Sequence, residues 1–362
     1  MRKILHYVQN DRDYIIKSHA KVRFFTESKG IRLLQMNKNR EIFPILTTFL
    51  QFCTPMIPIH FAPLQGHTDD VYRRIHHQFI GGIECYYTPF VRVEAGDIRS
   101  KDRRDIDPKN NEGVPVVPQI IFKSLKEFTY LVDEIEALGY RSIDLNMGCP
   151  FPLQAKHGRG SGLLAHTDII EEITQVIKER SQTNFSVKMR LGWEDNEEWE
   201  SVLKILNGTP LTHIALHPRT GIQQYKGDID YNAFARFYEE CRHPLIYNGD
   251  LTTLEQLHEM EERYPRLAGL MLGRGLLARP SLAKEYTEDR EWSHEEHIRS
   301  LRSLHEKLTE QYSNIVKGDA QLHSKLRTFW EYTEPLIGRK PYKKIMKSGN
   351  LRNYMSAIEE LR

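Results

Sequence analysis

From residue 56 onward, short apolar runs alternate with helical stretches of about ten to fifteen residues. Eight of the apolar runs are candidate strands: Ile57–Ala62, Glu84–Tyr87, Val114–Ile121, Ser142–Leu145, Phe185–Met189, His213–Leu216, Pro244–Tyr247 and Ala268–Leu272. The helical stretches between them include Leu125–Leu138, Asp168–Glu179, Glu198–Leu206, Tyr231–Glu240 and Thr253–Glu262. This alternation is typical of βα units joined in a parallel sheet. Eight units predict an α/β fold, a (β/α)8 TIM barrel. A doubly wound open sheet is the alternative, but no GxGxxG follows the first strand.

The two ends of the chain depart from this pattern. After about residue 290, three helical stretches follow without a strand, Trp292–Leu308, Ala320–Tyr332 and Met346–Leu361. We therefore expect a barrel over residues 56–290 and a small helical domain over 291–362. Residues 1–55 show no strand–helix repeat, so we expect an N-terminal extension that is poorly ordered or not native. Translation starting at Met56 is one hypothesis, and a genuine basic extension is the other. A secretory signal is not expected, because no compact apolar core precedes a small-residue cleavage site.

Charge is nearly balanced over the whole chain but unevenly distributed. The 362 residues hold 51 Lys and Arg and 49 Asp and Glu, which argues against disorder or a uniformly basic nucleic-acid-binding surface. Residues 1–55 and 317–352 each have a net charge of +6, which leaves −10 for the remainder. An acidic body with basic ends suggests a polyanionic partner, and ordinary solvated surfaces are the alternative interpretation.

Apolar runs and cysteines exclude other classes of protein. No apolar run reaches the roughly 18 residues of a transmembrane helix. The four cysteines, Cys53, Cys85, Cys149 and Cys241, lie far apart without a CxxC motif. This spacing argues against zinc, an iron–sulfur cluster and a disulfide framework, and it fits a reducing, cytoplasmic compartment. The sequence thus predicts no membrane, metal or protein partner.

Glycine-containing loops follow the last two predicted strands, where the chemistry of such barrels gathers. They are Asn248-Gly249-Asp250 and Gly273-Arg274-Gly275. Glycine lets backbone N–H groups face phosphate oxygens, and Arg274 can add a bidentate clamp. Tight turns are the alternative for either loop alone. Both loops together, with Lys188 and His217 on neighbouring strands, favour a bound phosphorylated cofactor.

Two further strand ends carry reactive side chains. Lys188 and Arg190 alternate with apolar residues, so they share one strand face, where an inward charge requires an anion. A flavin, which gains negative charge on reduction, is one such anion, and an internal salt bridge is the alternative. Cys149 lies between Gly148 and Pro150 directly after a strand, where a thiol can act as nucleophile or general acid. A buried structural role suits the other cysteines better.

Together these residues resemble the tRNA-dihydrouridine synthase family. The matching motifs are APLQGHTD (62–69), Gln119, DLNMGCP (144–150), GSGLL (160–164), VKMRLGW (187–193), HPRT (217–220) with Tyr225, NGD (248–250) and LGRGLLARP (272–280). The similarity spans about 56–280 in order, and the tail with His323, Arg327 and Trp330 also looks like that family's C-terminal domain. The combination of NxGCP, NGD and GRG at these spacings is specific.

The resemblance implies an FMN-dependent barrel with a helical tRNA-binding domain. The implied reaction reduces the C5=C6 bond of specific uridines in the D-loop region of tRNA, with NADPH as reductant, a hydride from flavin N5 and a proton from Cys149. By the same resemblance, FMN is bound by Pro63, Leu64, Gln65, Gln119, Lys188, His217, Asn248, Gly249, Asp250, Gly273 and Arg274. The implied substrate contacts are Asn146, Arg190 and Arg327.

This chain departs from the family pattern in two motifs. Leu64-Gln65-Gly66-His67 replaces the usual MAG or MEG followed by Val, and Pro218 replaces the glycine of HGRT. Proline has no N–H, so that amide cannot donate to a cofactor. Two other functions compete. An FMN barrel that acts on a small molecule, such as a dihydroorotate-type oxidoreductase or an ene-reductase, would not need the basic tail. A non-catalytic RNA-binding protein on a degenerate barrel would carry no flavin.

Overall fold

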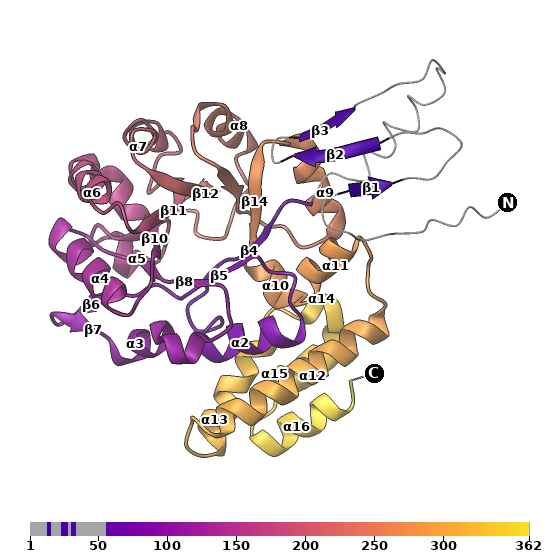
Figure 1. The fold of residues 1–362 in the computed structure, drawn as a ribbon. Helices are drawn as coiled ribbons and strands as arrows, with labels where there is room; N and C mark the ends of the chain where they lie inside the picture. Colours follow the sequence, from indigo (N-terminus) through magenta and orange to yellow (C-terminus); the bar gives the residue numbers. More distant parts are fainter. Residues whose placement is uncertain (1–12, 16–22, 28–29, 34–55, 362) are drawn as a thin grey trace. The chain divides into compact units, whose positions relative to one another are not determined.

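A parallel sheet of nine strands forms the centre of the larger part of the molecule (Figure 1). The computed structural model describes residues 13–15, 23–27, 30–33 and 56–361. The strands, in sheet order, are β8 (Val116–Val117), β5 (Cys85–Tyr87), β4 (Ile59–Phe61), β14 (Leu267–Leu272), β13 (Leu245–Tyr247), β12 (Leu211–Thr220), β11 (Asn184–Gly192), β10 (Ser142–Met147) and β9 (Gln119–Ile120). Every neighbouring pair runs parallel.

The sheet closes because one segment supplies both of its edges. The third predicted strand, Val114–Ile121, is split at Pro118 into β8 and β9. β8 pairs with β5, and β9 pairs with β10. Proline donates no ladder hydrogen bond, so the segment can leave one neighbour and join the other there. Eight strand segments thus surround the core, and the (β/α)8 prediction is confirmed.

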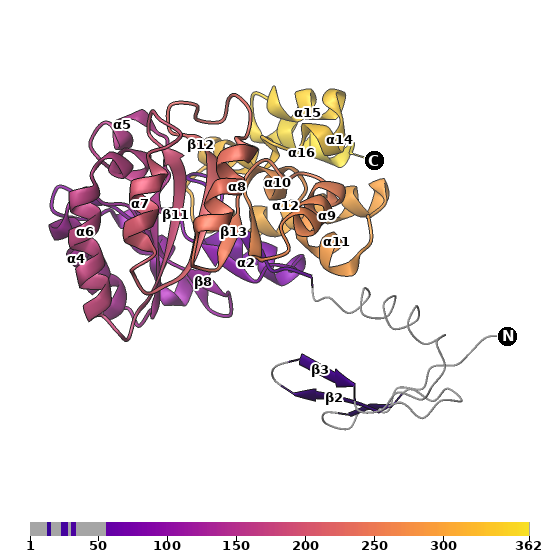
Figure 2. The same cartoon turned by 90° about the horizontal axis from the view of Figure 1, so that it is seen from above.

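Helices follow the strands and cover the outside of the barrel (Figure 2). They are α2 (Asp70–Phe79), α3 (Ser100–Ile106), α4 (Leu125–Ala137), α6 (Thr167–Glu179), α7 (Trp199–Leu206), α8 (Tyr231–Glu240), α9 (Leu254–Arg263) and α11 (Leu282–Glu288). Each of the longer ones has one apolar face, as the buried Ile170, Ile173 and Ile177 of α6 illustrate. Shorter elements lie in the connections: the β6 (Val93–Glu94) and β7 (Asp97–Ile98) hairpin, η1 (Pro108–Asn111), α5 (Pro152–Ala155), η2 (Gly160–Ala165) and α10 (Arg274–Ala278).

The C-terminal part is helical, as the sequence predicts, but it contains more helices than expected. They are α12 (His294–Ser313), α13 (Asp319–Arg327), η3 (Thr328–Trp330), α14 (Glu334–Ile337), α15 (Arg339–Met346) and α16 (Leu351–Glu359). Gly318 and Gly338, with φ of 81° and 82°, separate neighbouring helices, because this conformation suits glycine and interrupts a helix. The sequence analysis missed α14 and α15, whose Pro335 and Pro341 weigh against a helix except in its first turn.

These helices share their core and pack against the barrel. The phenol oxygen of Tyr354 contacts the indole nitrogen of Trp330 at 2.9 Å and the Nε2 of His305 at 2.6 Å, all within a buried cluster. On the barrel side, α12 packs against α2, where the Arg74 guanidinium donates to Gln311 at 3.0 Å. Residues 57–362 therefore form one compact unit. The division at residue 290 into two domains stays a prediction.

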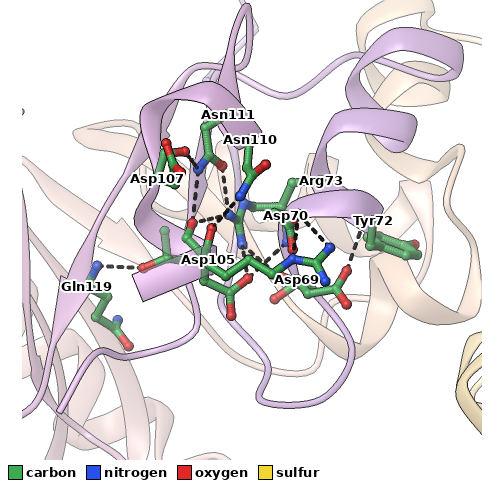
Figure 3. Close-up of polar contacts among 12 residues, drawn as sticks. Asp69, Asp70, Tyr72, Arg73, Asp105, Asp107, Asn110, Asn111 and Gln119 are labelled. Carbon is green, nitrogen blue, oxygen red and sulfur yellow. Dashed lines mark hydrogen bonds and ion pairs between the residues drawn. The ribbon is translucent and has the colours of Figure 1, made fainter. Parts of the chain in front are cut away.

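A buried arginine holds the first βα loop in place (Figure 3). The Arg73 side chain on α2 is 1% exposed and donates to the backbone oxygens of Thr68 at 2.7 Å and Asp105 at 2.8 Å. It also donates to Asn111 Oδ1 at 2.7 Å. Because a buried guanidinium requires such partners, the loop that contains Thr68 is tied to the end of α3 and to η1.

Residues 1–56 form a separate N-terminal unit, of which the structure describes part. Its strands β1 (Asp13–Ile15), β2 (Arg23–Glu27) and β3 (Gly30–Leu33) form an antiparallel sheet in that order. The sequence analysis found no strand–helix repeat there and named none of these strands. Its expectations of poor order and of a start at Met56 concern residues that lie mostly outside the described ones. Among the described residues, no helix has both the length and the apolarity needed to cross a bilayer.

Candidate active site

A cavity of about 1160 Å³ opens at the carboxyl ends of the barrel strands, a little larger than the roughly 300–1,000 Å³ of common ligand pockets. Fourteen of the predicted site residues line it: Pro63, Leu64, Gln65, Gln119, Asn146, Cys149, Lys188, Arg190, His217, Asn248, Gly249, Asp250, Gly273 and Arg274. Arg327 does not line the cavity, and it lies exposed on α13 in the C-terminal part. The barrel thus brings together the ends of seven predicted strands, whereas Arg327 stands apart.

The backbone of Cys149 is held at both its N–H group and its carbonyl oxygen. Its backbone N–H donates to Asn146 Oδ1 at 2.8 Å, and its carbonyl oxygen accepts from the Ser161 hydroxyl at 2.9 Å and the Ser161 N–H at 3.1 Å. A side chain at Gly160 would lie 2.7 Å from the Cys149 Cβ, so glycine is required there. The loop therefore presents the thiol to the cavity in a defined position.

The thiol of Cys149 is kept protonated by its surroundings. Burial raises the pKa of this thiol above its ordinary value. A hydrogen bond from Phe151 and the positive charges of Arg190 and Lys188 lower the pKa in part. A protonated thiol donates a proton and is a poor nucleophile. Of the two roles that the sequence left open, the environment favours the general acid.

Two cationic side chains of the cavity form no ion pair with a carboxylate among the described residues. The Lys188 ammonium makes no hydrogen bond or ion pair with any described residue, and burial together with the Arg190 charge lowers its pKa to about 8. Arg190 is 2% exposed and donates to the backbone oxygen of Thr220 at 2.7 Å, without a carboxylate partner among the described residues. The internal salt bridge that the sequence left open is therefore not formed. An anion that enters the cavity meets two unneutralised cations.

His217 faces the cavity as a neutral donor. Its Nε2 lies 3.1 Å from a guanidinium nitrogen of Arg219. Arginine has no acceptor, so Nε2 accepts and Nδ1 carries the proton. Burial and the surrounding cations hold the pKa of His217 well below its usual range. The residue therefore adds a hydrogen-bond donor to the site without adding charge.

Asp250 pairs with two arginines, of which Arg274 lines the cavity. Its carboxylate accepts from Arg219 at 2.5 Å and pairs with Arg274. Asp250 has a φ of 42°, which a non-glycine residue adopts only where its surroundings enforce it. The Arg274 guanidinium also lies 4.6 Å from the ring centre of Tyr225, a cation–π distance. The loops after β13 and β12 and helix α10 are thus joined at the cavity wall.

Pro218, which replaces the family's usual glycine, lies inside β12. The pairing of β11 with β12 shifts register between Arg190 and Gly192, opposite this proline. A proline in a strand is tolerated at such irregularities, because no ladder hydrogen bond is demanded of it. The substitution therefore leaves the adjacent His217 in the lining.

The residues of the cavity fit an FMN cofactor. The planar flavin ring and phosphate of FMN need space, a basic environment and backbone donors. The cavity supplies the volume, the unpaired Lys188, the His217 Nδ1–H and the loops at Gly249 and Gly273. At Gly249 a Cβ would lie 2.9 Å from Ile229 Cδ1 and from the Tyr247 hydroxyl oxygen, so a larger residue there would have to displace these side chains. No group of His, Cys, Asp and Glu side chains within the described residues is arranged to hold a metal ion.

Sequence reasoning missed part of the lining. The additional residues include Phe90, Arg92, Arg99, Phe151, Leu153, His157, Arg159, Tyr332 and Pro335. Phe151 and Leu153 are 54% and 64% exposed, and their place directly after the cysteine motif was a usable signal. Tyr332 comes from the C-terminal part, so no local sequence pattern predicted its position at the barrel cavity.

The order of these strand-end residues agrees with one protein family. A model of the dihydrouridine synthase (Dus) family matches residues 60–361. The chain belongs to the dihydrouridine synthase family. A probable tRNA-dihydrouridine synthase of Helicobacter pylori strain J99 is 33% identical over 229 residues, which cover 61% of this chain and 67% of that protein. A probable tRNA-dihydrouridine synthase of Staphylococcus aureus strain COL is 29% identical over 279 residues, which cover 75% and 82%.

Solved structures resemble this dihydrouridine synthase family member more remotely. The old yellow enzyme from Trypanosoma cruzi aligns with 65% of this chain and 89% of its own at a TM-score of 0.46 and 10% identity. That score is too low to bear on the fold or the function.

Proposed function

We propose that this chain is an FMN-dependent tRNA-dihydrouridine synthase that reduces uridines in the D-loop region of tRNA with NADPH. The observation that carries the proposal is the position of Cys149, whose backbone is held by Asn146 and Ser161 in the lining of a basic cavity, in a chain of this family. The reaction adds a hydride to uracil C6 and a proton to C5, so it needs a proton donor beside the cofactor. The names of the relatives support tRNA as the substrate.

FMN, when bound and reduced by NADPH, supplies the hydride that uracil C6 receives. Lys188, His217 and Arg274, with the loops at Gly249 and Gly273, would hold it. The positive charge of Lys188 favours the anionic form of the cofactor, because no described carboxylate neutralises this ammonium by direct contact.

Cys149 gives its proton to uracil C5 from the Sγ atom. As the hydride arrives, negative charge develops on the uracil, and a positioned acid of suitable pKa lowers that barrier. Asn146 is held in place by Gln119 at 2.7 Å and by the backbone of the cysteine loop. We assign Asn146 and Arg190 to the uracil itself, and Arg327 to the tRNA outside the cavity. A uracil reaches this cavity only after it leaves its stack in the tRNA.

The C-terminal helices supply the surface for the rest of the tRNA. Arg339, Lys340, Lys343 and Lys347 lie exposed on or directly after α15, without an ion pair among the described residues. Phosphate contacts of this kind favour a folded RNA by its shape and charge. The free thiols of Cys85, Cys149 and Cys241 support a reducing, cytoplasmic location.

The test uses purified protein, FMN, NADPH and an unmodified tRNA transcript. We expect dihydrouridine in the digested tRNA by mass spectrometry, dependent on NADPH, and none with Cys149→Ala within the same time. Small enones and orotate, offered in place of tRNA, test the rival small-molecule oxidoreductase. Efficient turnover of these with no dihydrouridine in tRNA would overturn the proposal, and so would a protein that binds no flavin.

A further inference from the structure

A buried carboxylate that the proposed reaction does not use lies one layer below the site. Asp144 on β10 is fully buried, with 0% of its surface exposed. The sheet register places it level with Gln119 of β9 and Ser186 of β11. Asp144 Oδ2 accepts from Gln119 Nε2 at 2.7 Å, and Oδ1 accepts from the Ser186 hydroxyl at 2.6 Å.

From this carboxylate a chain of hydrogen bonds leads to the cysteine loop. Gln119 Oε1 accepts from Asn146 Nδ2 at 2.7 Å. Asn146 Oδ1 accepts in turn from the N–H groups of Gly148 at 3.1 Å and Cys149 at 2.8 Å. Three side chains therefore connect the interior of the barrel with the backbone of the proton donor.

The direction of every bond in this chain follows from its first member. An ionised carboxylate only accepts, so Gln119 must turn its amide NH2 toward Asp144 and its oxygen toward Asn146. Asn146 must then turn its NH2 toward Gln119, which leaves its oxygen for the two backbone N–H groups. With either amide reversed, two oxygens or two NH2 groups would face each other in a buried site.

We propose that Asp144 is a positioning residue, which fixes the orientation of the Gln119 and Asn146 amides and thereby the position of the Cys149 loop. The inference rests on the proposed function, because it assigns Asp144 a part in presenting that proton donor. Asn146 has two parts in this arrangement. Its oxygen holds the cysteine loop, and the orientation of its amide group decides which of its atoms remain for the substrate.

The surroundings of Asp144 agree with this role. A buried carboxylate is costly, and burial raises the pKa of Asp144 to about 6, against the Ser186 and Gln119 hydrogen bonds and the charge of Lys188. A neutral apolar residue in its place would avoid that cost but would leave the Gln119 NH2 without an acceptor. The carboxylate therefore contributes orientation rather than stability.

Three variants separate orientation from charge. Asp144→Asn removes the charge but keeps an oxygen for Gln119, since Ser186 can accept from its NH2. Asp144→Leu removes both. Ser186→Ala is the matched control, because it removes the other partner of Asp144 and leaves the chain to Cys149 intact.

Two measurements are made on each variant. In FMN-free protein, the alkylation rate of Cys149 by iodoacetamide is followed by mass spectrometry of its peptide. In FMN-loaded protein, single-turnover reduction by NADPH and reoxidation by unmodified tRNA are timed separately. We expect Asp144→Leu to accelerate Cys149 alkylation roughly tenfold, as a loosened loop opens more often. We also expect it to slow reoxidation by tRNA roughly 10²-fold, with reduction by NADPH retained. Asp144→Asn and Ser186→Ala should resemble the wild type in all three rates.

Each other outcome overturns the inference. Wild-type rates in a folded Asp144→Leu protein would remove Asp144 from the presentation of Cys149. Equal losses in Asp144→Asn and Asp144→Leu would make charge, not orientation, the cause. If Asp144→Leu does not fold, the double variant Asp144→Asn with Ser186→Ala replaces it. In that variant no serine hydroxyl fixes which atom of the asparagine amide faces Gln119. Effects of the two substitutions that merely add would contradict the inference. Failure of wild-type protein to modify tRNA would refute the proposed function instead, while the alkylation measurement still tests Asp144.

Discussion

The side chains of Lys325 and Asp69 form an ion pair of 2.8 Å between the C-terminal helices and the first βα loop of the barrel. Asp69 also accepts from the Tyr312 hydroxyl at 2.7 Å and caps α2 through the Tyr72 N–H. Burial alone would raise the pKa of Asp69, but Lys325 and these hydrogen bonds hold it below its usual range. Lys325 additionally donates to the Gly66 carbonyl at 3.3 Å. The loop that lines the cavity is thus attached to the helices proposed to bind tRNA.

Loss of the Lys325 ammonium should destabilise the protein. In Lys325→Met, Asp69 keeps two hydrogen bonds but loses its counter-charge in a largely buried place, so we expect a loss of about 1–3 kcal/mol. Urea unfolding at neutral pH measures it. Lys317→Met, an exposed lysine without an ion pair among the described residues, serves as the control and should stay within about 0.5 kcal/mol of the wild type. Equal stabilities of the two variants would contradict the prediction.

Removal of the Cys149 thiol should affect one half-reaction only. In Cys149→Ala, flavin binding and reduction by NADPH should persist, because neither needs the proton donor. Reoxidation by tRNA should fall roughly 10²–10⁴-fold, the usual contribution of a positioned acid. Cys149→Ser should fall similarly, since a hydroxyl is a far weaker acid than a thiol. Single-turnover oxidation of pre-reduced enzyme by tRNA measures the reoxidation rate of both variants. As controls, Cys85→Ala and Cys241→Ala should keep the wild-type rate. Loss of bound FMN in Cys149→Ala would mean that the cysteine is structural.

Arg274 should contribute to cofactor retention. Its guanidinium pairs with Asp250 but has five N–H donors, so it can contact a phosphate at the same time. We expect Arg274→Ala to weaken FMN binding roughly 10–100-fold, the effect of a lost charge-assisted hydrogen bond. Flavin fluorescence titration of the apoprotein gives the affinity. Arg236→Ala, which changes an exposed arginine on α8, is the control, and an unaltered affinity in Arg274→Ala would exclude the clamp.

The exposed cations of α15 should determine tRNA affinity and its salt dependence. We expect charge reversal at Arg339, Lys340, Lys343 and Lys347 to weaken binding and to reduce the salt slope by up to about 0.9 per lost phosphate contact. Filter binding over a range of salt concentrations measures both quantities. NADPH oxidation by the bound flavin should be unaffected. Reversal of Lys178 on α6 is the control, and an identical loss there would show a non-specific charge effect.

Buried histidines should make the protein acid-sensitive. Burial lowers the pKa of His60 and His305 to about 3 and of His213 to about 4. These rings stay neutral in the folded protein, whereas the unfolded chain binds protons below about pH 6.5. Stability is therefore retained above that pH and falls as the pH drops from about 6.5 toward 4. His305→Gln should reduce the slope of unfolding free energy against pH by up to about 1.4 kcal/mol per unit. Urea unfolding at several pH values checks this, with the exposed His157→Gln as control; a slope unchanged in His305→Gln would refute it.

Local patterns predicted the elements better than their ends. The strand expected over Phe185–Met189 extends over Asn184–Gly192, and the one expected over His213–Leu216 extends over Leu211–Thr220. Polar residues near the strand ends, such as His217, have a low propensity for strands, yet they lie inside them. Strand pairing satisfies their backbones, and the cavity accommodates their side chains. The periodicity was therefore interrupted where the site begins.

The sequence by itself determined the order of βα units, the helical C-terminal part and fourteen of the residues that line the cavity, because the alternation of apolar residues and the strand-end motifs are local properties. Tertiary structure alone decided the closure at Pro118, the contact of Lys325 with Asp69, the position of Tyr332 at the cavity and the separation of Arg327 from it. These depend on which surfaces pack together across hundreds of residues. No short-range pattern carries that information, since the free energy of such contacts arises only when distant segments leave water together.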